Sequence, residues 1–397
     1  MLLPTSQRFY VLLAGLFSQL LCLGVARFAY TPLLPIMQQQ TQLDDATGGY
    51  LAATNYLGYM AGALLAANLN NLQLKDTLYR LGLLLAIMST LGMALTQNIY
   101  LWACWRFVAG LSSAGSMLIA SGLIMHWLLS YKQRAELGIH FAGLGLGIAL
   151  SALLVELMLQ FGFNWRAQWQ YFALLAVLLA IPAWRWLPRP ELASSPLKSV
   201  PSDSPPSKRF MQLMLASYFC AGYGYVISAT FIVTIVERMP GLAGSGNVSF
   251  IVLGLAAAPA VLLWDFIARK TGYLKAITLA LLVQFLAILL PLWLSSLSAV
   301  LFSAALFGAT FVGVVSLVLT MAGRLYPSKP AKLMGKMTLA YGSAQVVSPA
   351  ITGGLAEVSG HYTLGLYLAA GFVGLGALLL TVLIVTDRTA QQLDTRQ

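Results

Sequence analysis

The sequence predicts an all-α polytopic membrane protein with twelve transmembrane helices, arranged as two pseudo-symmetric six-helix bundles. The first observation is composition: apolar residues make up 59% of the 397 residues and charged residues only 9%, with a mean hydropathy of +0.79. Soluble domains carry about 25% charged residues, because water must wet their surfaces. The second observation is that apolar residues gather in long stretches, and the third is that one polar segment divides these stretches into two sets. Most of the surface is therefore expected to face lipid.

Twelve stretches are long enough to cross a bilayer, since a helix needs about 20 apolar residues to span ~30 Å of hydrocarbon. In the first half they are expected at 9–37, 48–69, 76–96, 99–128, 137–160 and 168–187. In the second half they are expected at 211–237, 247–268, 275–295, 299–323, 336–357 and 364–386. Only Gln97 and Asn98 separate the third stretch from the fourth, so this boundary rests on very little sequence.

The polar segment 188–209 reads PRPELASSPLKSVPSDSPPSKR and separates the two halves. It is rich in Pro and Ser and has no apolar period, so we expect a cytoplasmic linker without a core of its own. The predicted domains are 1–187, an N-terminal six-helix bundle, and 210–397, a C-terminal six-helix bundle with a short cytoplasmic tail. The apolar run continues past Cys22 and a bulky Leu21 precedes it, so neither signal cleavage nor lipidation is expected.

The distribution of Lys and Arg predicts the orientation in the membrane. Of the 23 such residues, only Arg166 and Arg238 fall on one side, two lie within spans, and the rest fall on the side shared by both termini and the linker. Because Lys and Arg accumulate in cytoplasmic loops, both termini are expected in the cytoplasm of a bacterial inner membrane. The same bias accounts for the formal net charge of +11, which indicates topology and no nucleic-acid partner.

No sequence pattern indicates catalysis, a metal or a cofactor. The histidines His126, His140 and His361 lie in different segments without an HExxH motif, and the three cysteines lack the spacing of a zinc or disulfide site. No Gly-rich phosphate loop precedes a Lys-Ser or Lys-Thr pair, so ATP-driven transport is not expected. A ligand sensor and a membrane-embedded enzyme are rival classes, but the first needs a signalling domain and the second a clustered acid, base or metal site. We expect no enzyme, and a monomer in the lipid bilayer.

Four polar residues lie within the first, second, fourth and fifth spans: Arg27, Asn55, Arg106 and Glu156. From a helical rise of ~1.5 Å per residue, Arg27 should lie roughly 15 Å and Arg106 about 10 Å below the outer surface. An intramembrane arginine costs about 2.5–3.5 kcal/mol on insertion scales, so both should face protein or a water-filled cavity. Glu156 either pairs with one arginine and locks helices together, or leaves an excess positive charge. The excess charge favours an anionic substrate, although backbone carbonyls and water are equally able to cover it.

Tyrosines gather in the middle of the seventh span, where Tyr218, Tyr223 and Tyr225 follow one another, and the eleventh span adds Tyr341 and Gln345. Buried tyrosine hydroxyl groups usually find a hydrogen-bond partner. Their partner is expected to be either a substrate or a neighbouring helix, and packing between helices accounts for them equally well.

Several stretches resemble the major facilitator superfamily. WRFVAGLSSAGS at 105–116 resembles its fourth-span motif and places Arg106 at the motif arginine. WDFIARKTGYLK at 264–275 resembles the loop motif of that superfamily, whereas the equivalent 62–80 has Asn68, Asn70 and Asn71 in place of the acidic residue of the motif. The fifth span resembles the antiporter motif but lacks its proline, so this motif does not support exchange or efflux. GVARFAYTPLLPIM at 24–37 and YFCAGYGYVISATF at 218–231 resemble the YbfB/YjiJ-like branch.

This resemblance implies alternating access, in which two halves rock around a site near the middle of the membrane. It also implies that the first, fourth, seventh and tenth spans line the cavity. The expected substrate-binding residues are Arg27, Tyr30, Asn55, Arg106, Tyr223, Tyr225, Tyr341 and Gln345. Glu156 is the expected proton-coupling residue. Burial raises the pKa of a carboxyl group and a neighbouring arginine lowers it, so binding of a proton can switch such a pair. Asp265 is the alternative, and with Arg269 and Gly272 it forms the expected conformational loop motif.

The expected function is secondary active transport of a small, anionic organic solute across the inner membrane, coupled to protons. The alternative is efflux of amphipathic or drug-like compounds by proton antiport, since 11% aromatic residues and 14 methionines suit an adaptable apolar cavity.

Overall fold

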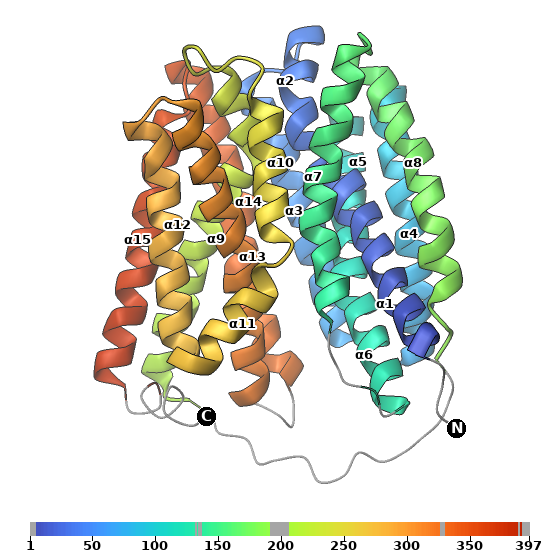
Figure 1. Ribbon diagram of the computed structural model, residues 1–397, viewed down its shortest axis with the longest axis vertical. Helices are drawn as coiled ribbons and strands as arrows, with labels where there is room; N and C mark the ends of the chain where they lie inside the picture. Colours follow the sequence, from blue (N-terminus) through green and yellow to red (C-terminus); the bar gives the residue numbers. More distant parts are fainter. Residues whose placement is uncertain are drawn as a thin grey trace.

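The computed structural model describes residues 5–131, 133, 137–190, 206–325, 330–387 and 390, and every secondary-structure element in these residues is a helix. The helices of the first half lie on one side of the molecule and those of the second half on the other (Figure 1). The start of α1 and the end of α15 lie at the same end, which we call the terminal end (Figure 1). The opposite end is called the distal end below.

Two spans of the first half are composite. The first consists of α1 (Thr5–Gln19), the π-helical segment η1 (Leu20–Phe28) and α2 (Tyr30–Gln40). The fourth consists of α5 (Ile99–Ala114), the π-helical η2 (Gly115–Ala120) and α6 (Ser121–Ser130). The other helices of this half are α3 (Asp45–Asn68), α4 (Leu72–Leu95), α7 (Gly138–Gln160) and α8 (Trp165–Trp186).

The second half begins with α9 (Lys208–Glu237), and residues 191–205 of the expected linker lie outside the described residues. The remaining helices are α10 (Gly246–Ala257), α11 (Ala260–Thr271), α12 (Tyr273–Trp293), α13 (Leu297–Leu325), α14 (Pro330–Ser359) and α15 (Thr363–Thr386). The helices α10 and α11 meet at a bend of 46° and together correspond to one expected span. The exact domain boundaries stay a prediction.

The prediction of an all-helical membrane fold is confirmed, but the count of twelve is not reproduced in full. Within the described residues, nine spans meet a length and hydropathy criterion for crossing a membrane, and the bent pair brings the number to ten. The helices α3 and α14 are as long as the others but carry more polar residues. They pack against each other between the two halves, so much of their surface contacts protein instead of lipid.

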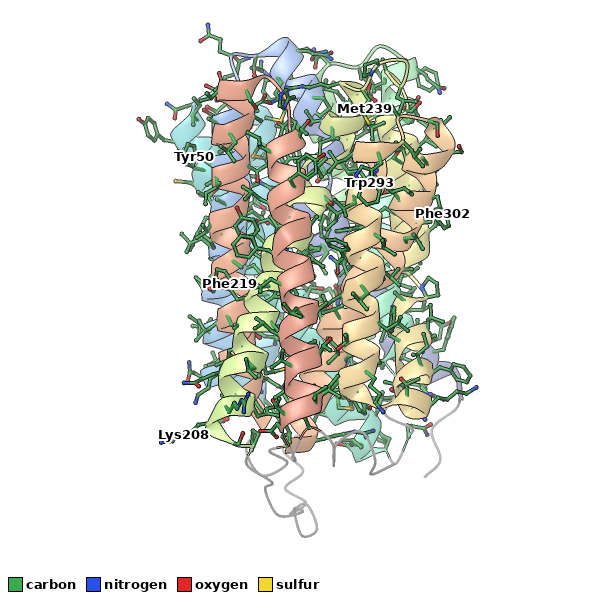
Figure 2. All side chains as sticks on the ribbon, turned by 90° about the vertical axis from the view of Figure 1, so that its left-hand side faces the viewer. Tyr50, Lys208, Phe219, Met239, Trp293 and Phe302 are labelled. Carbon is green, nitrogen blue, oxygen red and sulfur yellow. The ribbon has the colours of Figure 1, made fainter. Side chains whose placement is uncertain are left out.

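The outer surface of the bundle carries large apolar side chains. Trp293 on α12 and Phe302 on α13 point outward from the molecule (Figure 2), and each is about three-fifths exposed in the absence of a membrane. Soluble monomers rarely expose a continuous apolar surface. This belt therefore marks the surface that lipid would cover.

The boundary between the third and fourth spans is set by a helix cap. Helix α4 ends at Leu95 and α5 begins at Ile99, and the side-chain oxygen of Asn98 accepts hydrogen bonds from the backbone N–H groups of Tyr100 and Leu101. Asn is among the residues best suited to this position, because its side chain binds N–H groups that have no partner within the helix. The expected division at Gln97 and Asn98 is therefore found in the structure.

Glycines allow the two halves to approach closely along α7 and α10. A Cβ atom on Gly254 would lie 2.4 Å from the backbone nitrogen of Ala149 and 2.7 Å from the carbonyl oxygen of Gly145. Neither contact is permitted, so the backbones of these helices touch where Gly145 and Gly254 meet. Small residues at such crossings are how membrane helices pack tightly.

We expect Gly254→Ala to destabilise the protein by about 1–3 kcal/mol, because the added methyl group must push two backbones apart. A thermal denaturation curve of the purified protein measures this as a lower melting temperature. Gly371→Ala is the matched control, since a Cβ atom at Gly371 meets nothing within 4 Å. Equal melting temperatures for the two variants would show that the halves do not touch at Gly254.

Candidate functional site

Arg27 lies in η1, and only 6% of its surface is exposed. Its guanidinium carbon lies 4.6 Å from the ring centre of Tyr56 and 4.7 Å from that of Tyr59. Among the described residues no carboxylate forms an ion pair with it, and its Nε atom has no hydrogen-bond partner. Arg27 is therefore a buried cation held by aromatic rings and without a counter-ion.

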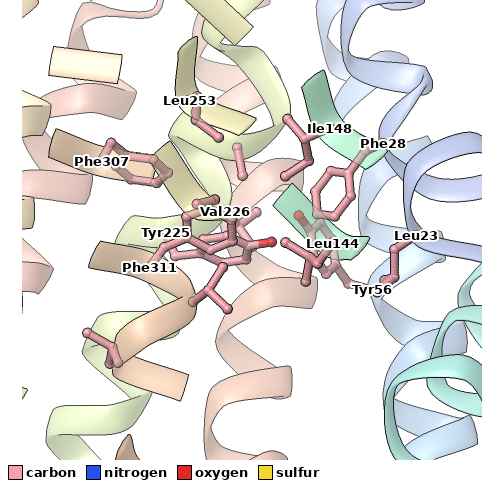
Figure 3. Packing of buried hydrophobic residues seen from close by; sticks show 14 of the residues in the cluster. Leu23, Phe28, Tyr56, Leu144, Ile148, Tyr225, Val226, Leu253, Phe307 and Phe311 are labelled. Carbon is pink, nitrogen blue, oxygen red and sulfur yellow. The ribbon is translucent and has the colours of Figure 1, made fainter. Parts of the chain in front are cut away.

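Arg27 faces a cavity of about 70 Å³ between the two halves. Arg27 and Tyr59 line it from the first half, and Tyr218, Tyr225 and Gln345 line it from the second. Figure 3 shows the packing around this region, where Tyr225 and Phe311 approach Phe28 and Leu144. A cavity of this size holds a few water molecules, so the two halves leave little free space beside Arg27 in this conformation.

The second-half wall of the cavity is aromatic. Tyr218 and Tyr341 stack with ring centres 4.5 Å apart, and Tyr225 stacks on Phe311 at 5.0 Å. Gln345 presents a buried side-chain oxygen without a partner among the described residues. Three of the expected substrate-binding residues, Tyr225, Tyr341 and Gln345, thus meet Arg27 at one cavity.

Tyr223 lies elsewhere. Its ring stacks on Phe372 of α15 at 4.1 Å, and it is not among the residues that line the central cavity. Tyr218, which the sequence analysis named beside Tyr223 but not among the expected binding residues, lines the central cavity. Tyr218 and Tyr225 are seven residues apart, about two turns of helix, so they share one face. Tyr223 is two residues from Tyr225 and therefore points to the other side of the helix.

Arg106 supports η1 from behind. Its Nη1 atom donates to the carbonyl oxygens of Ala26 at 3.3 Å and Arg27 at 3.2 Å, and its guanidinium group lies over the ring of Tyr30 at 4.3 Å. Asn55 in turn donates to the carbonyl oxygen of Arg106 at 2.8 Å. Arg106, Tyr30 and Asn55 therefore form a buried group that holds the backbone carrying Arg27, and none of them lines the central cavity.

The π-helical winding of η1 explains these contacts. Hydrogen bonds in a π-helix run from residue i to i+5, which leaves carbonyl groups displaced from their usual α-helical partners. In η1 the N–H group of Ala29 binds the carbonyl oxygen of Gly24, and side chains of the fourth span bind other carbonyls. The sequence provides no signal for this winding.

Glu156 does not pair with an arginine in the described part of the chain. Its Oε2 atom accepts a hydrogen bond at 3.0 Å from the side-chain nitrogen of Asn247 on α10. The interpretation in which Glu156 neutralises Arg27 or Arg106 is therefore not supported by the structure. Glu156 instead connects α7 of the first half to α10 of the second.

The expected loop motif lies at the end of α11. Arg269 and Asp265 form an ion pair of 2.6 Å on the surface, and the two residues are one helical turn apart. Gly272 ends the helix with φ of 98°, a conformation that residues with a side chain rarely adopt. These three residues lie at the end of one helix, and their role as a conformational motif stays a prediction.

A cluster at the distal end was missed by sequence reasoning. Both nitrogens of the Arg238 guanidinium group donate to the Asp45 carboxylate, at 2.6 and 2.7 Å. Tyr362 and Gln38 donate to the same carboxylate at 2.8 and 2.7 Å, and Glu357 accepts from the backbone N–H group of Asp45 at 3.0 Å. We call these five residues the distal cluster. Because Gln38 and Asp45 belong to the first half and the others to the second, the cluster joins the two halves.

The charges of the distal cluster stabilise each other. Burial alone would raise the pKa of Asp45, but hydrogen bonds from Arg238 and Tyr362 outweigh it and hold this pKa below its usual value. The hydrogen bond to Asp45 raises the pKa of Arg238 above its usual value. Both residues lie outside the spans expected from the sequence, and both stay ionised at neutral pH. The one signal in the sequence was that Arg238 is a rare cation on its side of the membrane.

The terminal end has a larger opening between the halves, of about 750 Å³. Its walls come from α3, η2, α6, α13 and α14, and they include Met60, Met125 and Met334. It shares Leu118, Leu319 and Thr338 with the central cavity, so the two are continuous. The path around Arg27 is thus closed at the distal end and open toward the terminal end. In the described residues no three His, Cys, Asp or Glu side chains gather in a way that could hold a metal ion.

Known proteins show which family shares this arrangement. The family described as "Uncharacterised MFS-type transporter YbfB" matches residues 19–381. YceJ of Bacillus subtilis (strain 168), an MFS-type transporter, is 24% identical over 278 residues, which are 68% of this chain and 69% of YceJ. The sialic acid transporter NanX of Escherichia coli (strain K12) is 23% identical over 309 residues, covering 72% of this chain and 71% of NanX. The transporter YgaY of the same strain is 28% identical, but only over 42% of each chain.

A solved structure shows the same fold. The crystal structure of the nucleoside transporter NupG superposes with a TM-score of 0.72 and covers 96% of this chain and 99% of NupG, at 12% sequence identity. The two-halved helical architecture and the match over residues 19–381 agree with each other. The chain is an integral membrane protein that belongs to the YbfB-like family of major facilitator superfamily transporters.

Proposed function

We propose that the protein is a secondary active transporter that moves a small organic anion across the bacterial inner membrane by alternating access. The observation that carries this proposal is Arg27, a buried cation at the central cavity that has no counter-ion among the described residues. We further propose that both termini lie in the cytoplasm, so that the terminal end faces the cell interior.

An anion at the central cavity would complete the contacts of Arg27. Cation–π contacts with tyrosine supply about 0.5–2 kcal/mol, which offsets only part of the cost of burying a guanidinium group. A carboxylate binds such a group by two parallel, charge-assisted hydrogen bonds. Further selection would come from the tyrosine hydroxyl groups and the unpartnered oxygen of Gln345, which would favour anions with additional polar groups able to bind them.

Alternating access is supported by the opposite states of the two ends. The distal cluster holds the halves together at one end, whereas the 750 Å³ opening separates them at the other. In the proposed orientation this is a state open toward the cytoplasm. Transport then requires the ion pair between Asp45 and Arg238 to break as the terminal end closes.

The relatives support the class of substrate only in general terms. NanX is a transporter of an organic acid, and NupG is a transporter of nucleosides. Because NanX is only 23% identical to this chain, the identity of the anion rests on experiment.

We propose proton coupling through Glu156, which binds Asn247 across the two halves. A carboxylate accepts this hydrogen bond, whereas a protonated carboxyl group also donates, so proton binding changes a contact between the halves. Asp265 is less suited, because it is partly exposed and already bound to the exposed Arg269 one helical turn away.

A second candidate is efflux of amphipathic compounds by proton antiport. The observation that favours it is the opening at the terminal end, whose methionines Met60, Met125 and Met334 offer flexible apolar contacts. Compounds of this class would bind in that opening and not against Arg27.

The experiment that separates the two candidates is a thermal-shift screen of the purified protein. Each carboxylate is compared with its neutral amide, for example benzoate with benzamide, and tetraphenylphosphonium represents lipophilic cations. A ligand that binds the folded state raises the melting temperature by mass action. Stabilisation by carboxylates alone supports anion transport, and stabilisation by tetraphenylphosphonium supports the efflux candidate and counts against Arg27 as the binding group.

The best carboxylate is then measured for flux into proteoliposomes under an imposed pH gradient. We expect Glu156→Gln to abolish the dependence of flux on the gradient, because the amide has no proton to exchange. Gln284→Leu is the control for a buried polar residue in the second half. Gradient-dependent flux in Glu156→Gln would assign coupling to another group.

A further inference from the structure

A polar pocket lies inside the first half, around a histidine that the proposed transport cycle does not use. His140 on α7 is 0% exposed. Its Nε2 atom lies 3.0 Å from the side-chain nitrogen of Gln19 on α1 and 2.8 Å from the hydroxyl oxygen of Ser121 on α6. Two glycines make room for this pair: a Cβ atom on Gly15 would lie 2.4 Å from His140 Nδ1, and one on Gly143 would lie 2.8 Å from Gln19 Cβ.

Two buried atoms of this pocket have no hydrogen-bond partner in the described residues: Nδ1 of His140 and Oε1 of Gln19. A neutral imidazole has one donor and one acceptor nitrogen. In the tautomer that carries its hydrogen on Nδ1, Nε2 accepts from the Gln19 amide nitrogen that faces it. A protonated imidazole has two donors, so Nε2 then needs an acceptor. The unpartnered Oε1 of Gln19 becomes that acceptor after a half-turn of the amide group, and the backbone of Gly15 lies beside Nδ1 to receive the second N–H.

The pocket is connected to the opening at the terminal end. Ser121, whose hydroxyl group contacts His140, is one of the residues that line this opening. The Ser121 hydroxyl group also donates to the carbonyl oxygen of Met117. Its oxygen can therefore accept from Nε2 when that atom carries a hydrogen, and its one hydrogen serves either Met117 or His140. One hydroxyl group therefore separates the buried imidazole from the path that is open at the terminal end.

The groups that face His140 are neutral. Helix α1 contributes Gln19, and Ser18 beside it binds Ser116 of η2 at 3.0 Å. The titratable groups of the adjoining layer are Cys22 of η1, which interacts with Ser116, and Tyr79 of α4, which interacts with Ser18. Within the described residues, no Asp, Glu, Lys or Arg side chain interacts with the imidazole. A proton on His140 would thus introduce the single charge of this pocket.

We propose that His140 and Gln19 form a proton-binding site that exchanges protons with the opening at the terminal end through Ser121. The Gln19 amide serves both protonation states, as donor to the neutral ring and as acceptor from the charged one. A role of this site in coupling would be additional to that of Glu156 and rests on the proposed function, with His140 exchanging protons on the cytoplasmic side. Proton binding itself depends on no substrate.

The test is a titration of the histidine side chains by nuclear magnetic resonance, with full-length protein labelled at histidine and held in lipid nanodiscs. The chain has only 3 histidines, so the ring signals are few. His126→Asn and His361→Asn identify the His140 signals by elimination, without altering the pocket. We expect His140 to pass reversibly from one ring N–H to two as the pH is lowered from about 8 to about 3, with the transition below that of a solvated imidazole, because burial without a counter-charge disfavours the charged ring.

The role of Gln19 is tested by Gln19→Leu, which removes the acceptor for the charged ring. We expect its proton affinity to fall at least about tenfold, a downward shift of one pH unit in the midpoint, since hydrogen bonds to charged groups contribute about 1.5–3 kcal/mol. The matched control is Gln284→Leu, a buried glutamine of the second half, which should leave the midpoint unchanged. A ring that keeps one protonation state throughout, or equal midpoints in the two variants, overturns the proposal. If His140 titrates as expected while no anion binds, only the proposed function fails.

Discussion

Asp45→Asn will open the distal end of the protein. The amide keeps one acceptor oxygen but loses the charge that Arg238 binds with both of its nitrogens. Hydrogen bonds to charged groups contribute about 1.5–3 kcal/mol, so we expect a loss on the order of 2 kcal/mol, which changes the balance of open and closed states roughly 30-fold.

The measurement is labelling of Ala229→Cys, made in a Cys104→Ser background, by a thiol reagent that does not cross membranes. Ala229 is 2% exposed, and its carbonyl oxygen accepts from Thr31 of the other half. We expect the reagent, added at the distal side, to label this cysteine much faster in Asp45→Asn. Arg166→Ala is the control, because Arg166 lies on the same side but stacks on Trp165, outside the distal cluster. Equal labelling with and without the Asp45 substitution would mean that the cluster does not hold the end closed.

The pH dependence of this closure follows from the pKa of Asp45. Because this pKa is lowered in the closed state, the carboxylate stabilises closure above its ordinary pKa. The stabilisation is lost only as the pH falls through the lowered pKa. The ratio of labelling rates of Ala229→Cys between the protein with Asp45 and the Asp45→Asn variant should therefore be constant between about pH 5 and pH 8, since the thiolate fraction of the cysteine changes alike in both.

Arg27→Met will weaken carboxylate binding and Arg106→Met will lower the stability of the protein, although both substitutions remove a buried arginine from the first half. Arg27 faces the cavity with an unpartnered Nε atom, so its loss should weaken carboxylate binding by about 30-fold or more. It should not lower the melting temperature, because removing an uncompensated buried charge does not destabilise a protein. Arg106 donates to two carbonyl oxygens of η1, and its loss removes both of these charge-assisted hydrogen bonds at a cost on the order of 2 kcal/mol.

The measurement pairs ligand binding with thermal denaturation for each variant, using the carboxylate that stabilises the protein most. Arg27→Lys is the matched control: it keeps the charge but loses the fork geometry, so partial binding is expected. Unchanged carboxylate affinity in Arg27→Met would remove the argument for an anionic substrate. A neutral amide should bind the native protein and Arg27→Met alike.

The sequence was sufficient for the helices and for much of the cavity, because both depend on local composition. Long apolar runs predict spans, and a cation within such a run must face protein or water, as Arg27 does. Tyr225, Tyr341 and Gln345 were expected at the site because they are polar groups deep in their spans, and they line the cavity.

The remainder depended on contacts between segments far apart in the chain. Asp45 and Arg238 lie outside the spans and in different halves, so counting charges assigned Arg238 to topology alone. Asn247 was not recognised as the partner of Glu156, since a hydrogen bond between α7 and α10 leaves no pattern in either segment. The estimated depths grouped Arg106 with Arg27 as binding residues. The structure shows that Arg106 instead donates to backbone carbonyl groups of η1, which the sequence does not reveal.

Because η1 is a π-helical segment, the hydrogen bonds that hold the Arg106 guanidinium group depend on the number of residues in the first span. A π-turn arises when a helix accommodates one extra residue without reorienting the segments on either side. Deleting one residue between 20 and 28 would leave α1 and α2 beside their present neighbours but return the carbonyls of Ala26 and Arg27 to ordinary helical bonding. Arg106 would then have lost its acceptors although no side chain near it had been replaced. In this span, chain length is as much a determinant of chemistry as residue identity.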